Sequence, residues 1–323
     1  MKKIPLEQRG ITNSRIAFGC MGLGKSLNPA SEEDILIAER AIDAALSVGI
    51  TFFDHADIYS RGNAEAVFGQ VLRRRPELKE QIVIQSKTGI CIPDERFGKR
   101  YDFSKEHILA SVDASLARLN VDHLEVLLLH RPDSLMEPEE IAEAFHTLRS
   151  SGKVRDFGVS NMSVSQIQFV QSALDEPLVA NQLDMSLNRV DWLDHGVLVN
   201  RKIDKVVRFP EGTLEYCRMQ NIQLQAWGPL AQGRFTGRTM DPSTETERLT
   251  TELVKRMADE KESTPESIVL GWLMRHPAMI QPVIGTANPE RIIACGDAVR
   301  QSEIMTREEW YALYMSSRGN DIP

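Results

Sequence analysis

A closed (β/α)8 barrel, the TIM-barrel architecture, is the fold that this sequence predicts. Short runs of β-branched and aliphatic residues alternate with amphipathic stretches of helical length, which indicates a parallel sheet. About eight such units fit within 323 residues, a length typical of one barrel. A doubly wound sheet would usually carry a GxGxxG sequence after its first strand, and none stands there. We therefore expect one barrel domain spanning residues 1–323.

The expected strands are short and mostly apolar. The run at 124–129 is almost entirely apolar, which is typical of a strand buried on both faces. The predicted strands cover residues 50–53, 82–86, 124–129, 154–159, 178–183, 222–227 and 283–284.

The expected helices begin at recognisable capping residues. Ser31, Ser104 and Ser163 each precede an amphipathic stretch and can cap it, and Gly49 ends the first one. The predicted helices cover residues 31–49, 63–74, 104–119, 137–148, 163–174, 214–219, 251–261, 266–275 and 289–299. Residues 4–18 are expected to form a small β-hairpin that plugs one end of the barrel.

Three segments are longer than the usual connections between barrel elements. They cover residues 91–103, 187–210 and 230–248, and each follows a predicted strand. In a barrel they would rise from the C-terminal face, where active sites lie. We therefore expect these long loops to border the site, although plain surface insertion stays an alternative for any one of them.

Composition excludes several classes of protein. A net charge of −8 argues against nucleic acid or an anionic membrane as the main partner. The four cysteines are far apart and form no CxxC pair, which fits a reducing compartment better than a disulfide framework. No apolar run follows Lys2 and Lys3, and none elsewhere is long enough to span a bilayer. A cytoplasmic protein is expected.

Ionisable residues stand at the ends of three consecutive strands. The segment FFDHADIYS, residues 52–60, begins as a buried strand and then turns to Asp54, with Tyr59 close behind. The next strand ends in Lys87, and the one after it ends in His130. Because the carboxyl ends of barrel strands meet at one rim, these four side chains are expected to lie together.

Such a cluster suits the reduction of a carbonyl group. Asp54 can keep a partly buried Lys87 cationic, and a cation beside a phenol is expected to lower the pKa of Tyr59 from about 10. Tyr59 could then exchange a proton with a carbonyl oxygen that His130 holds by a hydrogen bond. The cluster has no obvious nucleophile and too few ligands for a metal, so we expect no metal and a hydride-donating cofactor.

These residues resemble a known family. Asp54, Tyr59, Lys87 and His130, in this order and at these strand ends, are similar to the catalytic tetrad of the aldo-keto reductases. The resemblance extends to about residue 300 and is closest to bacterial oxidoreductases of YdhF type, through FDHADIY and LLLHRPDSLM. It implies NADPH-dependent reduction of an aldehyde or ketone, with Tyr59 as proton donor and without a Rossmann domain.

The resemblance also implies contacts with the nicotinamide. In FGVSNMS and ANQLD, Ser160, Asn161 and Gln182 match the residues that hold the carboxamide. In LQAWGPLAQGRF, Trp227 occupies the place of the aromatic residue that stacks on the nicotinamide ring.

The remaining contacts implied by the resemblance concern the phosphates. Gly285, Thr286 and Arg291 match the segment that grips the adenosine 2′-phosphate, for which a guanidinium is apt. The pyrophosphate would run along Gly228, Leu230, Gln232, Gly233 and Arg234.

The sequence departs from the family pattern at three positions. Many members have Lys in place of Gly285, and many have Asn in place of Cys295. The first change removes a cation from the 2′-phosphate site, and the second removes an adenine contact. His55, beside Asp54, is often a small residue elsewhere, and we interpret it as outward-facing or structural.

The sequence says less about the substrate pocket, and it leaves two alternative functions open. We expect Met21, Trp192 and the long loops to line a pocket for a small carbonyl substrate, in a protein that is a monomer. One alternative is an NADPH-sensing regulatory subunit with slow turnover, as the potassium-channel β-subunits of the same superfamily are. Another is a pyridoxal phosphate enzyme that uses Lys87 as its Schiff base.

Overall fold

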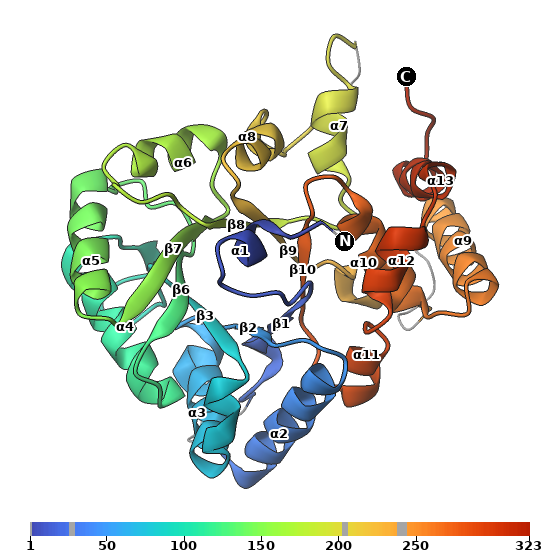
Figure 1. Cartoon of the computed structure of the whole chain (residues 1–323). Coiled ribbons are helices and arrows are strands. Elements are labelled where there is room, and N and C mark those ends of the chain that lie inside the picture. Colours follow the sequence, from blue (N-terminus) through green and yellow to red (C-terminus); the bar gives the residue numbers. More distant parts are fainter. Residues whose placement is uncertain (1, 26–29, 202–205, 238–243) are drawn as a thin grey trace.

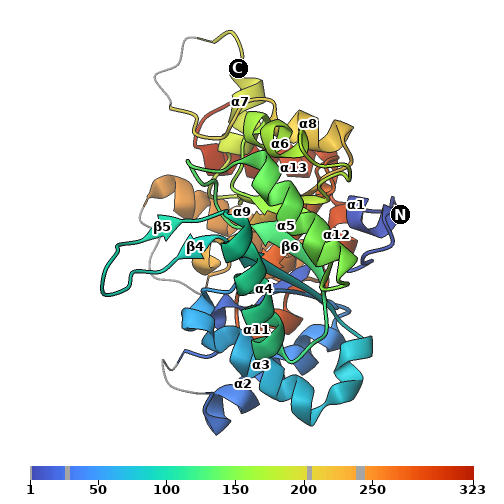
Figure 2. The ribbon, with the colours of Figure 1, turned by 90° about the vertical axis from the view of Figure 1, so that its left-hand side faces the viewer.

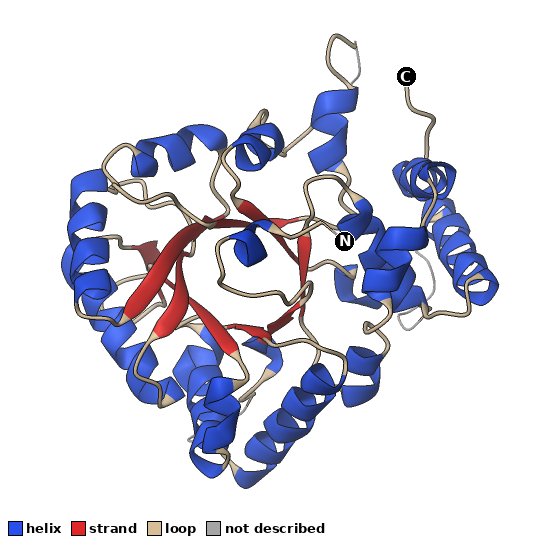
Figure 3. Ribbon diagram, in the orientation of Figure 1, coloured by secondary structure: helices blue, strands red, loops and turns tan. Residues whose placement is uncertain are grey.

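Eight parallel strands form a closed ring in the part of the chain that the computed structural model describes, which is residues 2–25, 30–201, 206–237 and 244–323. Each strand pairs in parallel with its neighbours, and β1 closes the ring against β10. Figure 3 shows these strands as an inner ring surrounded by helices, which confirms the predicted barrel. The strands of the ring are β1 (Ala17–Gly19), β2 (Phe52–Asp54), β3 (Val83–Thr88), β6 (Leu124–Leu129), β7 (Val154–Ser160), β8 (Ala180–Asp184), β9 (Gln223–Trp227) and β10 (Gln281–Ile284).

Helices cover the outside of the ring (Figure 1). The caps predicted at Ser31, Ser104 and Ser163 all form, since each side chain accepts a hydrogen bond from the backbone N–H three residues later. Among the described helices, none has the length and apolar character needed to cross a membrane. The α-helices are α1 (Pro5–Gln8), α2 (Glu32–Ser47), α3 (Asn63–Arg74), α4 (Lys105–Leu119), α5 (Pro138–Ser150), α6 (Val164–Gln171), α7 (Asp191–Val197), α8 (Thr213–Met219), α9 (Glu245–Glu260), α10 (Pro265–Arg275), α11 (Pro289–Ile293), α12 (Ala298–Ile304) and α13 (Arg307–Arg318), and the 3-10 turns are η1 (Cys20–Gly22), η2 (Tyr59–Gly62), η3 (Pro76–Glu80) and η4 (Ala231–Gly233).

Residues 4–18 do not form the predicted β-hairpin. Pro5 starts the one-turn helix α1, because its fixed φ suits a first helical position. Ala17–Gly19 instead becomes β1 of the ring. Ile4 and Leu6 are fully buried and belong to the apolar cluster that includes residues inside the ring. The segment therefore closes the amino end of the barrel, as Figure 1 shows with α1 over the opening, but it does so as a helical turn.

The long loops follow the carboxyl ends of their strands. The segment 91–103 contains most of a two-stranded hairpin, β4 (Ile90–Cys91) and β5 (Arg100–Tyr101), which pair antiparallel. Figure 2 shows this hairpin at the end of the molecule opposite α1. The segment 187–210 contains α7, and the segment 230–248 contains η4 and the start of α9. Residues 202–205 and 238–243 of these segments lie outside the described residues.

Candidate active site

Lys87 lies among buried polar groups at the carboxyl ends of β2 and β3. Its Nζ donates to both carboxylate oxygens of Asp54, at 2.8 and 2.7 Å, and to the carbonyl of His55 at 2.7 Å. It also donates to the phenol oxygen of Tyr59, at 3.1 Å. The Tyr59 ring lies edge-on to that of His130, with 6.1 Å between ring centroids. The four side chains predicted from strand ends are therefore neighbours.

Burial and the nearby cation act in opposite directions on Tyr59. Burial is the larger influence and raises the pKa of Tyr59 above its usual value, whereas Lys87 lowers it. The expectation of a lowered pKa is therefore wrong, because desolvation outweighs one ammonium group. Burial also opposes the charge on Lys87, but Asp54 and Tyr59 outweigh it and raise the pKa of Lys87. At neutral pH the site holds a protonated phenol beside a cationic amine.

His130 is a neutral imidazole in this environment. Burial, followed by the charges of Lys87 and Arg131, lowers the pKa of His130 to about 2. Its Nδ1 is buried and has no hydrogen-bond partner among the described residues. A neutral imidazole carries one N–H, which it can donate to an oxygen atom without a change of charge.

A layer of glutamines inside the ring supports Asp54, and the sequence analysis missed most of it. Gln85 and Gln182 each donate to Oδ1 of Asp54, at 2.6 and 3.1 Å. Both also donate to Oε1 of Gln225, which in turn donates to Gln281 at 2.9 Å. The sequence does contain a sign of this layer, because these glutamines interrupt otherwise apolar strands. The ring brings their positions into register.

The residues assigned to the nicotinamide are connected to one another. Trp227 donates from Nε1 to Oδ1 of Asn161 at 3.1 Å, which fixes the plane of the indole. Asn161 adopts a φ of 58° and donates to the carbonyl of His130 and to Oγ of Ser160. Ser160 donates to the carbonyl of Gln182. A fixed aromatic face therefore lies beside the ends of β6, β7 and β8.

The loop after Trp227 is partly engaged elsewhere. Gly228 adopts a φ of 64°, and the turn η4 follows Leu230 with Gln232 and Gly233 at positive φ. The guanidinium of Arg234 pairs with Glu247 of α9. The assignment of these five residues to the pyrophosphate stays a prediction. Arg234 would have to contact the pyrophosphate while it also pairs with Glu247.

The segment predicted to bind the adenosine 2′-phosphate has room for a larger side chain at Gly285. Gly285 is exposed, and a Cβ added there would meet no atom within 4 Å. Arg291 is exposed in α11, and no acidic side chain among the described residues pairs with it. Thr286 accepts a hydrogen bond from the backbone N–H of Asn288, and Cys295 is fully buried. Arg291 is thus available to a phosphate.

The family of this barrel is identified by its similarity to known proteins. The model of the aldo/keto reductase family matches residues 15–308. This chain belongs to the aldo/keto reductase family. It is 36% identical to the uncharacterized oxidoreductase YcsN of Bacillus subtilis, and 35% identical both to a 6-dehydroglucose reductase of Agrobacterium fabrum and to oxidoreductase YdhF of Escherichia coli, over 100% of each chain. The predicted resemblance to the YdhF branch is confirmed, and the protein is an oxidoreductase.

Solved structures share the fold of this aldo-keto reductase. An aldo-keto reductase from Klebsiella pneumoniae in complex with NADPH is similar with a TM-score of 0.73, over 96% of this chain and 92% of that one. At 24% sequence identity, the likeness concerns the barrel itself.

One predicted substrate contact in this aldo-keto reductase is wrong. Trp192 is 1% exposed and packs against Trp272 and His276, with ring centroids 5.5 and 5.2 Å away. It therefore fixes α7 against α10 instead of lining a pocket. Met21 is 65% exposed in η1, directly after β1, and its role as a substrate contact stays a prediction.

His55 is buried outside the ring, as the sequence analysis expected. Its ring meets Phe68 of α3 edge-on at 4.6 Å, and neither ring nitrogen has a hydrogen-bond partner among the described residues. Burial lowers the pKa of His55 to about 3. Only its backbone carbonyl, which accepts from Lys87, touches the tetrad.

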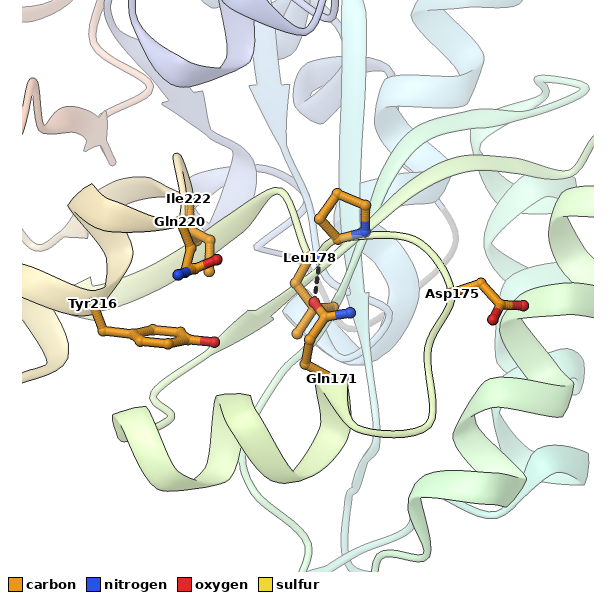
Figure 4. A pocket seen from close by; sticks show the side chains of 7 residues that line it. Gln171, Asp175, Leu178, Tyr216, Gln220 and Ile222 are labelled. Atoms are coloured by element: carbon orange, nitrogen blue, oxygen red, sulfur yellow. Dashed lines mark hydrogen bonds between the residues drawn. The ribbon is translucent and has the colours of Figure 1, made fainter.

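A cavity of about 250 Å³ lies between α6 and α8, far from the tetrad (Figure 4). Leu178 and Ile222 in its wall precede β8 and β9, so the cavity lies at the amino end of the barrel. The side chain of Gln171 there accepts from the N–H of Leu178 and donates to two carbonyls of the same turn. This polar wall therefore stabilises the turn before β8.

Proposed function

We propose that this aldo-keto reductase reduces an aldehyde or ketone to the alcohol with NADPH, and that Tyr59 donates the proton. The contact of Lys87 Nζ with both Asp54 and the Tyr59 phenol carries the proposal. When bound, NADPH supplies the hydride for the carbonyl carbon. Reduction then needs one proton at the carbonyl oxygen, which the protonated phenol of Tyr59 can donate.

The neighbouring side chains would each assist that proton transfer. The Lys87 ammonium, 3.1 Å from the phenol oxygen, stabilises the negative charge that Tyr59 acquires when it gives up its proton. Asp54 holds Lys87 in position through both carboxylate oxygens. His130, which is neutral, can donate its one N–H to the carbonyl oxygen and orient it.

The described residues fit NADPH. Trp227 offers a fixed aromatic face, and Ser160, Asn161 and Gln182 lie at the neighbouring strand ends for the carboxamide. Arg291 is exposed and free of acidic partners among the described residues, which suits the 2′-phosphate. Cofactor selectivity would rest largely on this one guanidinium, because Gly285 contributes no charge.

A hydroxylated aldehyde is the first substrate to test. Relatives at 35% and 32% identity are named 6-dehydroglucose reductases. Asp184 ends β8 near the tetrad and pairs with Arg189 at 2.9 Å, while Arg131 directly follows His130. These groups provide hydrogen-bond donors and acceptors for hydroxyl groups.

The two alternatives have less support. A Schiff base needs a neutral lysine, whereas the contacts of Lys87 with Asp54 and Tyr59 raise the pKa of Lys87 and keep it cationic. A sensing subunit that does not reduce carbonyl groups would not need the hydrogen bond from Lys87 to the phenol of Tyr59. Slow turnover with normal NADPH binding would favour sensing.

The test is Tyr59→Phe, measured for binding and for turnover. NADPH should quench tryptophan fluorescence in the variant as in the parent, because Trp227 is unchanged, while carbonyl reduction falls by about 10²- to 10⁴-fold. Tyr216→Phe, in α8 beside the remote cavity, is the control and should keep full activity. Undiminished turnover in Tyr59→Phe would show that another group donates the proton. Absence of quenching by NADPH in the parent would overturn the cofactor assignment.

A further inference from the structure

Three potential metal ligands gather beside the β4–β5 hairpin. Cys91 lies in β4, Asp102 directly follows β5, and His107 lies in the first turn of α4. One ligand atom from each lies within 4.8 Å of the other two. Sγ of Cys91 lies 3.9 Å from Nε2 of His107. Among the described residues, no other group of this kind was found.

The backbone places these three side chains together. Cys91 pairs with Arg100 in the hairpin, so Asp102, two residues further on, lies on the same face as Cys91. The N–H of Asp102 donates to the carbonyl of Gly89, which extends the pairing. Ser104 caps α4 by accepting from the N–H of His107, and its own N–H donates to Oδ1 of Asp102. The ligand positions are therefore fixed before any ion binds.

We propose that Cys91, Asp102 and His107 bind a zinc ion that fastens the β4–β5 hairpin to α4. A thiolate with an imidazole and a carboxylate favours zinc over calcium or magnesium, and water would complete a tetrahedron. In a tetrahedral zinc site, a sulfur ligand and a nitrogen ligand lie about 3.6 Å apart. This is close to the 3.9 Å between Sγ of Cys91 and Nε2 of His107. On binding, the thiol proton passes to solvent, and zinc replaces the 3.3 Å contact of Ser111 with Nε2 of His107.

The site would control how the hairpin stands over the barrel mouth. The hairpin is short, with Ile90 paired to Tyr101 and Cys91 paired to Arg100, and its tip, residues 92–99, is exposed. Cys91 follows Lys87 by four residues, so a fixed hairpin borders the tetrad. This zinc site is separate from carbonyl reduction and does not depend on the proposed function.

Zinc binding to the untagged full chain tests the proposal. Competition with a chromogenic chelator should show roughly one zinc ion per chain. Cys91→Ser and His107→Gln should each weaken binding by more than about tenfold, since even outer partners of metal sites contribute that much. His123→Gln is the control. His123 directly precedes β6 and pairs with Glu125 at 3.0 Å, so it is not one of the proposed zinc ligands. Equal affinity in all four proteins would mean adventitious surface binding and would overturn the proposal.

A spectroscopic readout separates ligation from general effects of mutation. Cobalt bound at the site should give a sulfur-to-metal absorption band that Cys91→Ser abolishes, while circular dichroism shows both proteins folded. Cobalt binding without this band would exclude the sulfur as a ligand. Of the four cysteines, all in the described part of the chain, only Cys91 is partly exposed. Zinc should therefore slow the reaction of the accessible thiol with a disulfide reagent, and an unchanged rate would contradict the proposal.

Discussion

At the scale of single residues, Asp54 shows how a buried charge is made tolerable. Its Oδ1 accepts from Lys87, Gln85 and Gln182, and its Oδ2 accepts from Lys87 as well. A buried carboxylate without such partners would be strongly destabilising. The glutamine layer thus stabilises the charged pair on which the proposed chemistry depends.

Gln225→Leu should therefore weaken both stability and catalysis. Gln225 accepts from Gln85 and Gln182 and donates to Gln281, so its loss leaves several buried amides unpaired. Each unpaired group costs about 1–3 kcal/mol, which urea unfolding would measure. Gln220→Leu, at the exposed end of α8, is the matched control and should change stability by less than about 0.5 kcal/mol. Equal stability of both variants would show that the glutamine layer is dispensable.

Gly285→Lys should increase the preference for NADPH over NADH. An added side chain meets no atom within 4 Å of its Cβ, and the backbone there is not left-handed, so the change is tolerated. A second cation beside Arg291 would contribute about 1.5 kcal/mol or more to phosphate binding, roughly tenfold in the affinity ratio. Fluorescence titrations with both cofactors measure this ratio, and Gly285→Gln controls for size without charge. An unchanged ratio would place the 2′-phosphate elsewhere.

At the scale of elements, the helices were easier to predict than the loops. The caps at Ser31, Ser104 and Ser163 are local, since each hydrogen bond spans three residues, and all three formed. Helix α7 and the β4–β5 hairpin were not predicted as such. Trp192 was assigned to the substrate pocket because it lies in a long loop, but tertiary packing against Trp272 decided its place.

The element that closes the amino end can be tested by Leu6→Ala. Leu6 is fully buried against the apolar interior of the ring, so truncation should lower the free energy of unfolding by about 2–5 kcal/mol. Carbonyl reduction at low temperature should persist, since α1 lies at the end of the molecule opposite the β4–β5 hairpin, which follows Lys87 in the chain (Figure 2). Gln8→Ala changes an exposed residue of the same turn and serves as the control. A loss of activity without a loss of stability would contradict this separation of the two ends.

At the scale of the whole molecule, buried histidines should make the protein sensitive to acid. Burial lowers the pKa of His55 to about 3, of His130 to about 2 and of His276 to about 4. These side chains bind protons in the unfolded chain below about pH 6.5 but not in the folded one. Their contribution to stability is complete above that pH and is lost as the pH falls.

Buried carboxyl groups act in the opposite direction, since burial raises the pKa of Asp57, Asp156 and Asp184. Burial raises the pKa of Asp57 to about 7, so its contribution is complete below about pH 3.8 and is lost as the pH rises through 7. Three histidines outweigh it, and the free energy of unfolding should fall as the pH is lowered from 6.5 towards 4. Each histidine contributes up to about 1.4 kcal/mol per pH unit. Urea unfolding across this range, repeated on His55→Leu, should show a smaller pH slope in the variant. A flat profile in the parent would contradict the burial argument.

The barrel, the family resemblance and the strand ends that carry the tetrad all follow from the sequence alone. They can be predicted because the alternation of apolar runs and capped helices is local, and because parallel strands of a barrel must end at one rim. Four features became visible only in the folded molecule: the glutamine layer, the burial of Trp192, the closing turn at Pro5 and the raised pKa of Tyr59. These depend on which residues distant in sequence come into contact and on how much water they exclude.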